Sequence, residues 1–221
     1  MKDVTFFYDG ERPVLKKIGM DFPKRGMIAI VGESGCGKTT LLNLIARLEK
    51  LSGGEITQYL DERFLKRKRG SKAWFRKVGV VYQNPDYQLF MPSVEKEIEF
   101  GADSKEYVGH IAELFHIKHL FPRHPQALSQ GQKRLVSIAA VLAGKPEVLL
   151  LDEPTVGQDY ERLCQMVKVL NEIHAKTKNT MITITHDLRC AEALCDTAYW
   201  IADGVVKKGG GKELVREYFN Q

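Results

Sequence analysis

Residues 32–39 carry the sequence pattern with the most direct chemical meaning in this chain. They read Gly-Glu-Ser-Gly-Cys-Gly-Lys-Thr and match the phosphate-binding pattern G-x-x-x-x-G-K-[ST] at every fixed position. In such a loop, backbone N–H groups surround a phosphate chain, Lys38 contacts the terminal phosphates and the Thr39 hydroxyl binds Mg²⁺. The candidate nucleotide contacts here are Gly32, Glu33, Ser34, Gly35, Cys36, Gly37, Lys38, Thr39 and Thr40. The pattern predicts a site for a nucleoside triphosphate with Mg²⁺.

The segments on either side of this loop must position it. Residues 27–31 form a short apolar run that predicts a buried strand. After the loop, Leu41, Leu44, Ile45 and Leu48 recur at helical spacing and predict a helix. A strand, a glycine loop and a helix in this order bring N–H groups and a helix N-terminus to one phosphate chain. These flanks favour a phosphate loop over a chance glycine-rich turn.

Two adjacent carboxylates end another predicted strand, residues 148–151. Asp152 is placed to hold Mg²⁺, and Glu153 to polarise the water that attacks the terminal phosphate. His186 follows the predicted strand 181–185, so it is expected at the same edge of the sheet, facing the γ-phosphate. Acidic residues also end strands for purely structural reasons. The phosphate loop upstream favours the functional interpretation, with Lys38, Glu153 and His186 as the catalytic group.

Residues 128–132, Leu-Ser-Gln-Gly-Gln, precede a predicted helix that runs to about Ala143. Ser129 and Gln132 have the S-x-x-Q spacing of a capping box, with Ser129 as N-cap. This pattern has a structural interpretation, because it simply starts a helix. A capped helix N-terminus with glycine is also an anion site, so a second phosphate contact is the alternative.

The composition of the 221-residue chain is ordinary for a globular protein, with 43% hydrophobic and 28% charged residues. No apolar run approaches the ~20 residues that span a bilayer, and the N-terminus is not that of a signal peptide. The four cysteines form no C-x-x-C pair, which favours a reducing, cytoplasmic setting. His116, His119 and His124 are interpreted as surface histidines rather than a metal site.

The net charge of +5 is unevenly distributed, because basic residues crowd one short segment. They are Arg63, Lys66, Arg67, Lys68, Arg69, Lys72, Arg76 and Lys77. Such a segment is able to contact nucleic acid or an anionic membrane, but a solvated loop and helix face is favoured. Phe64, Trp74 and Phe75 nearby fit core anchors as well as stacking platforms. We therefore predict no nucleic-acid partner.

Strand-like runs alternate with helical patterns along the chain, as in a parallel α/β sheet. The predicted strands are residues 4–8, 27–31, 78–82, 148–151 and 181–185, with a hairpin over 199–206. The stretch from 93 to 143 shows helical patterns and no convincing strand. We predict one domain, in which an α/β core (1–92 and 144–221) carries an inserted helical subdomain (93–143).

Together these motifs resemble those of the ATP-binding subunits of ABC transporters, over nearly the whole chain. In that family the L-S-x-G-Q signature, here residues 128–132, contacts the ATP held by the opposite subunit of a head-to-tail dimer. The resemblance implies a P-loop NTPase fold, ATP hydrolysis with Mg²⁺, and a second ATPase subunit. It also implies that Ser129, Gly131 and Gln132 contact the nucleotide of that second subunit.

Further residues take implied roles from matching positions of the family. Tyr8 matches the aromatic residue that stacks on adenine, and Gln83 matches the glutamine that touches Mg²⁺ and relays nucleotide state to the membrane subunit. Asp159 matches the loop aspartate that crosses the dimer interface. Two positions depart from the family pattern: Gln130 replaces the usual signature glycine, and Gln158 replaces the commoner leucine.

The run from Gln83 to Phe90, Q-N-P-D-x-Q-L-F, looks like that of the ATPases of energy-coupling factor (ECF) importers, which take up vitamins or cobalt and nickel ions. This likeness implies transmembrane partner subunits and a peripheral position on the cytoplasmic face of the cell membrane. Apolar or amphipathic side chains in this stretch predict a docking surface for a helix of the membrane subunit. They are Tyr87, Leu89, Phe90 and Met91.

Three alternatives to an importer ATPase remain open at this point. One is the ATPase of another ABC transporter class, and a second is a soluble ABC ATPase that acts on nucleic acid. The 90 residues from Thr39 to Leu128 are too few for the long coiled coil of DNA-repair members. A binding-only module is the third, disfavoured because Glu153 and His186 are both present. The chain is interpreted as either a complete subunit or one half of a tandem ATPase.

Overall fold

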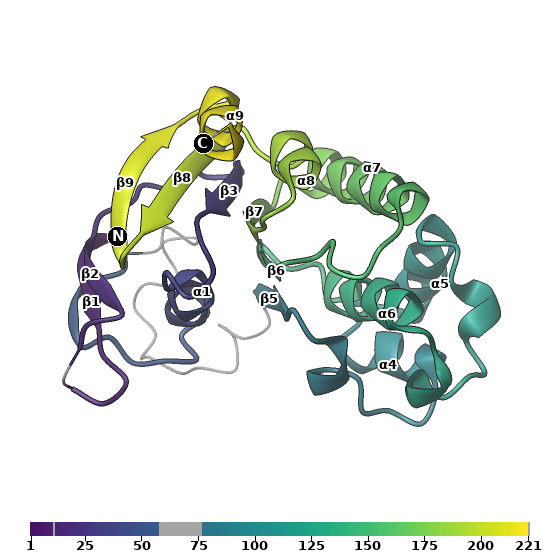
Figure 1. Ribbon diagram of the computed structural model, residues 1–221. Coiled ribbons are helices and arrows are strands. Elements are labelled where there is room, and N and C mark those ends of the chain that lie inside the picture. Colours follow the sequence, from purple (N-terminus) through teal and green to yellow (C-terminus); the bar gives the residue numbers. More distant parts are fainter. Residues whose placement is uncertain (11, 58–76, 221) are drawn as a thin grey trace.

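The computed structural model describes residues 1–10, 12–57 and 77–220, and Figure 1 draws its ribbon. Within these residues the larger sheet has the strand order β5-β6-β7-β3-β8-β9. Its strands are β3 (Met27–Val31), β5 (Val78–Val81), β6 (Val148–Asp152), β7 (Thr180–Ile184), β8 (Thr197–Ala202) and β9 (Val205–Gly210). All neighbours pair in parallel except β8 and β9, which are antiparallel. The predicted parallel sheet and its final hairpin are therefore confirmed.

The central strands are apolar along their whole length because both faces of the sheet are covered. All five residues of β3 are buried, and the bounds of this strand match the prediction. Along β6, Leu149 and Leu151 belong to the core beneath the helices α6 (Gln130–Ala143) and α7 (Tyr160–Thr177). Leu150 belongs instead to the core on the side of helix α1 (Lys38–Ile45). This alternation follows from the two-residue period of a strand.

A smaller antiparallel sheet, in the order β2-β1-β4, covers the far side of α1. It contains β1 (Lys2–Phe6), β2 (Leu15–Ile18) and β4 (Gly53–Glu55). The expectation that the first strand joins the parallel sheet is wrong. Only eight residues, 7–14, link β1 to β2, and a connection this short makes an antiparallel pair, whereas parallel strands need a crossover of about a dozen residues or more.

The helix after the phosphate loop, α1 (Lys38–Ile45), ends earlier than predicted. Arg47 has φ 61, a left-handed conformation that stops the helix. Leu48, which was expected on the buried face, is consequently exposed. Helix α1 lies between the two sheets, so the small sheet, α1 and the large sheet form three successive layers (Figure 1).

The remaining helices lie on the other face of the large sheet, at its β8 end, or packed against a helix of that face (Figure 1). They are α4 (Val94–Phe100), α5 (Lys105–Leu114), α6 (Gln130–Ala143), α7 (Tyr160–Thr177), α8 (Leu188–Ala193) and α9 (Lys212–Phe219). Short 3₁₀ helices occur at η1 (Pro85–Tyr87), η2 (Lys118–Leu120) and η3 (Pro125–Ala127). Residues 93–143, all described, contain helices and no strand.

The basic segment lies almost wholly outside the described residues, as do Phe64, Trp74 and Phe75; only Lys77 is described. Its interpretation as a solvated face or as a nucleic-acid or membrane contact therefore stays a prediction. In the described part of the chain, no helix combines the length and apolar character needed to cross a bilayer.

Candidate functional site

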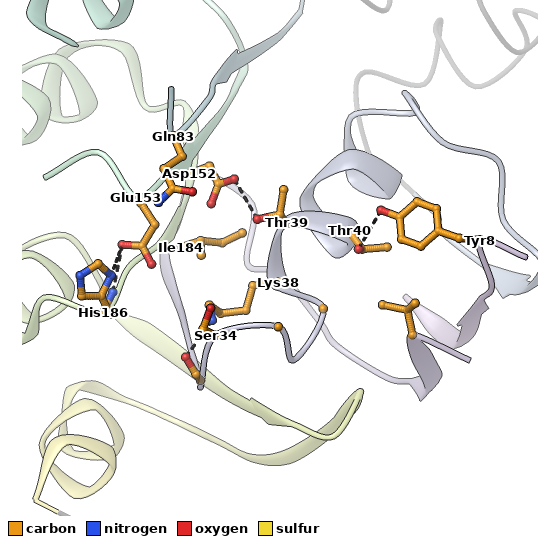
Figure 2. Close-up of a pocket in the computed structure, with 14 residues that line it drawn as sticks. Tyr8, Ser34, Lys38, Thr39, Thr40, Gln83, Asp152, Glu153, Ile184 and His186 are labelled. Carbon is orange, nitrogen blue, oxygen red and sulfur yellow. Dashed lines mark hydrogen bonds and ion pairs between the residues drawn. The ribbon is translucent and has the colours of Figure 1, made fainter. Parts of the chain in front are cut away.

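A cavity of about 600 Å³ opens at the carboxyl edge of the parallel strands (Figure 2). This is the edge at which ligands bind in open α/β sheets. Its lining residues are Tyr8, Val14, Gly32, Ser34, Gly35, Gly37, Lys38, Thr39, Thr40, Gln83, Asp152, Glu153, Ile184 and His186. The structure thus brings together the phosphate loop, both carboxylates, Gln83, His186 and Tyr8, which the sequence places in separate segments.

The phosphate loop wraps around the amine of Lys38. Its Nζ donates hydrogen bonds to the carbonyl oxygens of Gly32, at 2.8 Å, and Glu33, at 2.7 Å. Gly37 precedes α1 with φ 101, and a Cβ there would lie 2.7 Å from the Leu15 side chain. Only glycine satisfies both the conformation and the close approach. The loop therefore leads into the N-terminus of α1 with its backbone N–H groups beside the cavity.

Thr39 and Asp152 join the loop to the end of β6. The Thr39 hydroxyl donates to Oδ2 of Asp152 at 2.9 Å. Burial raises the pKa of the Asp152 carboxyl, and the hydrogen bond from Thr39 opposes this shift. The Thr39 hydroxyl, the Asp152 carboxylate and the side-chain amide oxygen of Gln83 all offer oxygen ligands at this cavity. Mg²⁺ prefers oxygen ligands. These residues fit a magnesium site.

Glu153 and His186 form a contact pair at the opposite end of the cavity from Tyr8 (Figure 2). Oε2 of Glu153 lies 2.8 Å from Nδ1 of His186 and accepts the His186 backbone N–H at 3.1 Å. The Glu153 N–H donates to the carbonyl of Ile184 at 2.8 Å. Glu153 has φ 47, unusual for a residue with a Cβ, and this left-handed turn directs the carboxylate from β6 toward the end of β7.

Tyr8 lies in the loop after β1 and is exposed. Its hydroxyl is 3.1 Å from Oγ1 of Thr40, and its ring packs edge-to-face on Phe6 with centroids 4.9 Å apart. The free ring face therefore stands at one end of the cavity, beyond the start of α1 (Figure 2).

The signature segment, residues 128–132, does not line this cavity, and neither do Gln158 and Asp159. The predicted capping box is confirmed: the Gln132 N–H donates to Ser129 Oγ at 3.3 Å, and the Ser129 N–H donates to Gln132 Oε1 at 3.1 Å. Asp159 caps α7 by accepting the Arg162 N–H at 2.9 Å. Gln158 Nε2 donates to the carbonyl of Gly131 at 3.4 Å. Ser129, Gly131, Gln132 and Asp159 thus share a second region.

Arg134 is a residue of the site that sequence reasoning did not identify. It is buried on α6 and donates to the backbone carbonyls of Tyr82 and Gln83. Burial lowers the pKa of this guanidinium. Arg134 therefore fixes the backbone of Gln83, a cavity residue. Val14 and Ile184, which also line the cavity, were not predicted either, because single apolar residues carry no distinctive pattern.

The histidines that were considered as metal ligands lie elsewhere. His116, His119 and His124 are exposed. Across residues 1–10, 12–57 and 77–220, no group of three or more His, Cys, Asp or Glu side chains is placed to hold a metal ion.

Comparison with known proteins connects this geometry to one family. A family model described as "ABC transporter" matches residues 15–156. The chain is 34% identical to the energy-coupling factor transporter ATP-binding protein EcfA1 of Mycoplasmopsis synoviae, over 98% of this chain and 84% of that protein. It is also 34% identical to YkoD of Bacillus subtilis over 94% of this chain, but it spans only 38% of that longer protein.

Two solved structures share the fold. One is cbiO1 of Clostridium perfringens, part of the ABC transporter complex cbiONQ, with a TM-score of 0.81, 30% identity, and coverage of 100% of this chain and 89% of that one. The other is a dimeric post-hydrolysis state of the ATP-binding cassette MJ0796 bound to ADP and Pi. It has a TM-score of 0.80 and 26% identity over 96% of this chain and 97% of that one.

Proposed function

The chain belongs to the ABC transporter family as an ATP-binding subunit with ATPase activity, and on this premise we propose that it energises an ECF-type importer. The observation that carries the proposal is the meeting of Lys38, Asp152 and the Glu153–His186 pair in one cavity. The Q-N-P-D-x-Q-L-F segment and the similarity to EcfA1 and cbiO1 support the importer branch. The solute is a vitamin, or a cobalt or nickel ion, chosen by a separate membrane subunit.

The phosphate loop and the polar residues opposite it in the cavity have proposed parts in hydrolysis. Lys38 and the N–H groups of residues 32–40 hold the β- and γ-phosphates of ATP. Thr39, Asp152 and Gln83 would hold Mg²⁺, which when bound neutralises charge on the phosphate oxygens. Glu153 accepts a proton from the attacking water as the water oxygen bonds to the γ-phosphorus and the bond to the β-phosphate oxygen breaks. His186 keeps the Glu153 carboxylate aimed at that water.

Tyr8 is proposed to stack on adenine. Its exposed ring stands at the far end of the cavity from Glu153, so a nucleotide that lies with its γ-phosphate near Glu153 has its base near Tyr8. Stacking of a base on an aromatic ring contributes about 1–3 kcal/mol in other nucleotide sites.

The second ATPase subunit is proposed to complete each site. Ser129, Gly131, Gln132 and Asp159 lie outside the cavity of their own chain, although the family resemblance assigns them to nucleotide binding and the dimer interface. In a head-to-tail dimer they would reach the partner's ATP. The partner is either a second copy of this chain or a homologue.

The proposed contact with the membrane subunit is a groove of about 960 Å³, lined by η1, α4, the first residues of β5 and the second half of α6. Tyr87, Phe90 and Phe100 expose aromatic rings there, and Phe90 packs edge-to-face on Phe100 at 5.2 Å. The buried Glu97 accepts the N–H groups of Phe90 and Met91 and so fixes the loop that presents them. An amphipathic helix fits a groove that combines exposed aromatic rings with charged side chains such as Lys77 and Glu147.

This function places the chain at the cytoplasmic side of the cell membrane, bound peripherally through its transmembrane partners. It also assigns the chain to a single ABC ATPase domain, with an α/β core (1–92 and 144–221) that binds nucleotide. The helical subdomain (93–143) carries the signature segment and one side of the docking groove, which includes Glu97 and Phe100.

The test is reconstitution with the membrane proteins encoded beside this chain's gene. The complex is placed in liposomes, and uptake of labelled vitamins, Co²⁺ and Ni²⁺ is measured with and without Mg-ATP. ATP-dependent uptake that is lost in Glu153→Gln supports the proposal. Export of solute, or ATP hydrolysis by the free chain that nucleic acid stimulates, would favour one of the two alternative ATPase classes.

A further inference from the structure

Asp86 connects the segment after Gln83 to the first turns of α6. Its Oδ1 accepts a hydrogen bond from Nζ of Lys133 at 2.6 Å, and its Oδ2 accepts one from Nε2 of Gln130 at 3.3 Å. Gln130 and Lys133 stand on either side of Gly131 and Gln132. One carboxylate therefore holds both edges of the turn that carries the signature residues.

Asp86 is itself held rigidly on the strand side. Asn84 Oδ1 accepts the Asp86 N–H at 3.0 Å, and the buried Pro85 begins the 3₁₀ turn η1. Two residues further on, Gln88 Oε1 accepts the Tyr82 N–H and Gln88 Nε2 donates to the Val80 carbonyl, both at 2.9 Å. These contacts anchor η1 to β5 without any help from α6. The carboxylate is thus a fixed point to which α6 attaches.

On the α6 side, the attachment is the ion pair between the Lys133 amine and the Asp86 carboxylate. The Lys133 side chain is only 8% exposed, and the Asp86 side chain is 34% exposed. Besides Asp86, the amine has a contact with Gln126 Oε1 at 3.1 Å. A buried ammonium without its anion is strongly unfavourable. The hydrogen bonds from Lys133 and Gln130 also lower the pKa of Asp86, so this carboxyl is ionised at neutral pH.

A second link runs parallel to this one. Arg134, the next residue on α6, binds the carbonyls of Tyr82 and Gln83. The start of α6 is thereby joined to both the backbone of Gln83, which lines the nucleotide cavity, and the side chain of Asp86, which does not. Gln130 stands where the family usually has glycine, and a glycine has no side chain with which to reach Asp86.

We infer that Asp86 is a positioning residue, which through Lys133 and Gln130 holds the Ser129–Gln132 turn in a fixed place relative to Gln83. Movement of the Gln83 segment is then transmitted to the surface that meets the ATP of a second subunit. Gln130 adds a second link to Asp86, which a glycine at this position would not make. The inference rests on the proposed composite site, and it predicts that Asp86 affects catalysis by the dimer but not ATP binding by the single chain.

Asp86→Asn is the variant that tests this, because it keeps the size of the side chain and removes its charge. Two quantities are measured: the specific ATPase activity against protein concentration, and the Kd of the dilute chain for a fluorescent non-hydrolysable ATP analogue. We expect the activity to fall about tenfold, a change of ~1.4 kcal/mol in the activation free energy. The Kd for the analogue should stay within about twofold of wild type.

Three further variants make the result specific. Lys133→Met should give a similar loss, and the double variant with Asp86→Asn should be no worse than either single one, because both remove the same contact. Gln130→Gly should give a smaller loss. Glu113→Gln is the matched control, since it breaks the exposed pair with Lys118 in the same helical region and should leave activity unchanged.

Wild-type activity in Asp86→Asn would overturn the inference, as would additive losses in the double variant. Weaker analogue binding together with a lower thermal unfolding midpoint would also overturn it, because the role would then be general stability. If the specific ATPase activity of the wild-type chain does not depend on protein concentration, the composite site is refuted, and the inference with it.

Discussion

The carboxylate of Glu153 and the imidazole of His186 are joined twice, by the 2.8 Å contact between Oε2 and Nδ1 and by the His186 backbone N–H. Glu153 is buried, whereas the His186 side chain is 66% exposed. The carboxylate is therefore oriented by a residue from the segment that follows β7, whose own ring remains exposed. This relationship supports the proposal that Glu153 activates water.

Replacement of Glu153 by Gln should abolish turnover but keep nucleotide binding. Glutamine has nearly the same shape and still accepts the His186 N–H, but it is not a base. General-base catalysis contributes about 10²–10⁴-fold, so kcat should fall by that range. The variant should also accumulate as an ATP-bound dimer, which size-exclusion chromatography with and without ATP measures. An unchanged hydrolysis rate would place the base elsewhere.

Lys38→Ala should act at the binding step. The Lys38 amine lies within the phosphate loop, held by the carbonyls of Gly32 and Glu33. In the proposed function this amine contacts the phosphates in the ground state as well as in the transition state, so its removal should weaken ATP binding itself. We expect the Kd for ATP to rise by at least about tenfold, measured by calorimetry. Lys24→Ala, at an exposed position outside the cavity, is the control and should bind normally.

The patterns that were predicted well are local ones. The strand 27–31, the loop after it and the capping box of Ser129 each depend on residues within a few positions of one another. The contact of Arg134 with Gln83 joins residues 51 positions apart. An arginine in a helical pattern ordinarily indicates a solvent-exposed position, so nothing in the sequence distinguished this one as buried.

Elements with weak periodicity account for the other differences. The partners of β1 are the sequences Leu-Lys-Lys-Ile and Gly-Gly-Glu, which show no two-residue alternation. Because neither partner strand is recognisable in the sequence, the pairing of the first strand could not be inferred from it. Helix α4 has seven residues and α8 has six, fewer than two helical turns. A three- to four-residue repeat is hardly visible over that length, and both helices were missed.

Three of the four cysteines, Cys164, Cys190 and Cys195, should differ sharply in their reaction with iodoacetamide. Burial raises the pKa of Cys190 to about 12 and that of Cys195 to about 11, whereas Cys164 is exposed. Because the thiolate is the reactive form, Cys164 should be labelled at pH 8 well before the two buried thiols. Mass spectrometry of the native chain, with a urea-unfolded sample as control, measures this. Equal labelling of Cys190 and Cys164 in the native chain would contradict the buried position of Cys190.

The same shifts predict how stability changes at alkaline pH. The folded pKa values of Cys190 and Cys195 lie above the ordinary thiol value of 9.0. Well below pH 9 these thiols are neutral in both the folded and the unfolded chain, so they do not change the free energy of unfolding. As the pH rises from 9 through the folded values, the unfolded chain ionises first, so the free energy of unfolding should decrease. Urea titrations at pH 8 and pH 10 test whether the free energy of unfolding decreases. Replacing both cysteines with serine should reduce the difference between the two pH values.

Tyr87 and Phe90 should be required for assembly with the membrane subunit. Both side chains are exposed, Tyr87 by 81% and Phe90 by 66%, whereas Leu89 between them is buried. Of the four residues of the expected apolar patch, the two aromatic residues are exposed, Met91 is half-buried and Leu89 belongs to the core. Exposed aromatic rings on a loop fixed by Glu97 and Gln88 have the character of binding hot spots.

Serine at both positions should reduce copurification with the membrane subunit by about tenfold or more, since aromatic hot spots contribute about 2 kcal/mol or more. ATP binding by the free chain should change little, because neither ring lines the nucleotide cavity. Leu48→Ser is the matched control, an exposed apolar side chain at a distant position, and should assemble normally. If the Tyr87 and Phe90 variants also assemble and transport at wild-type levels, the docking surface is not the groove between η1 and α4.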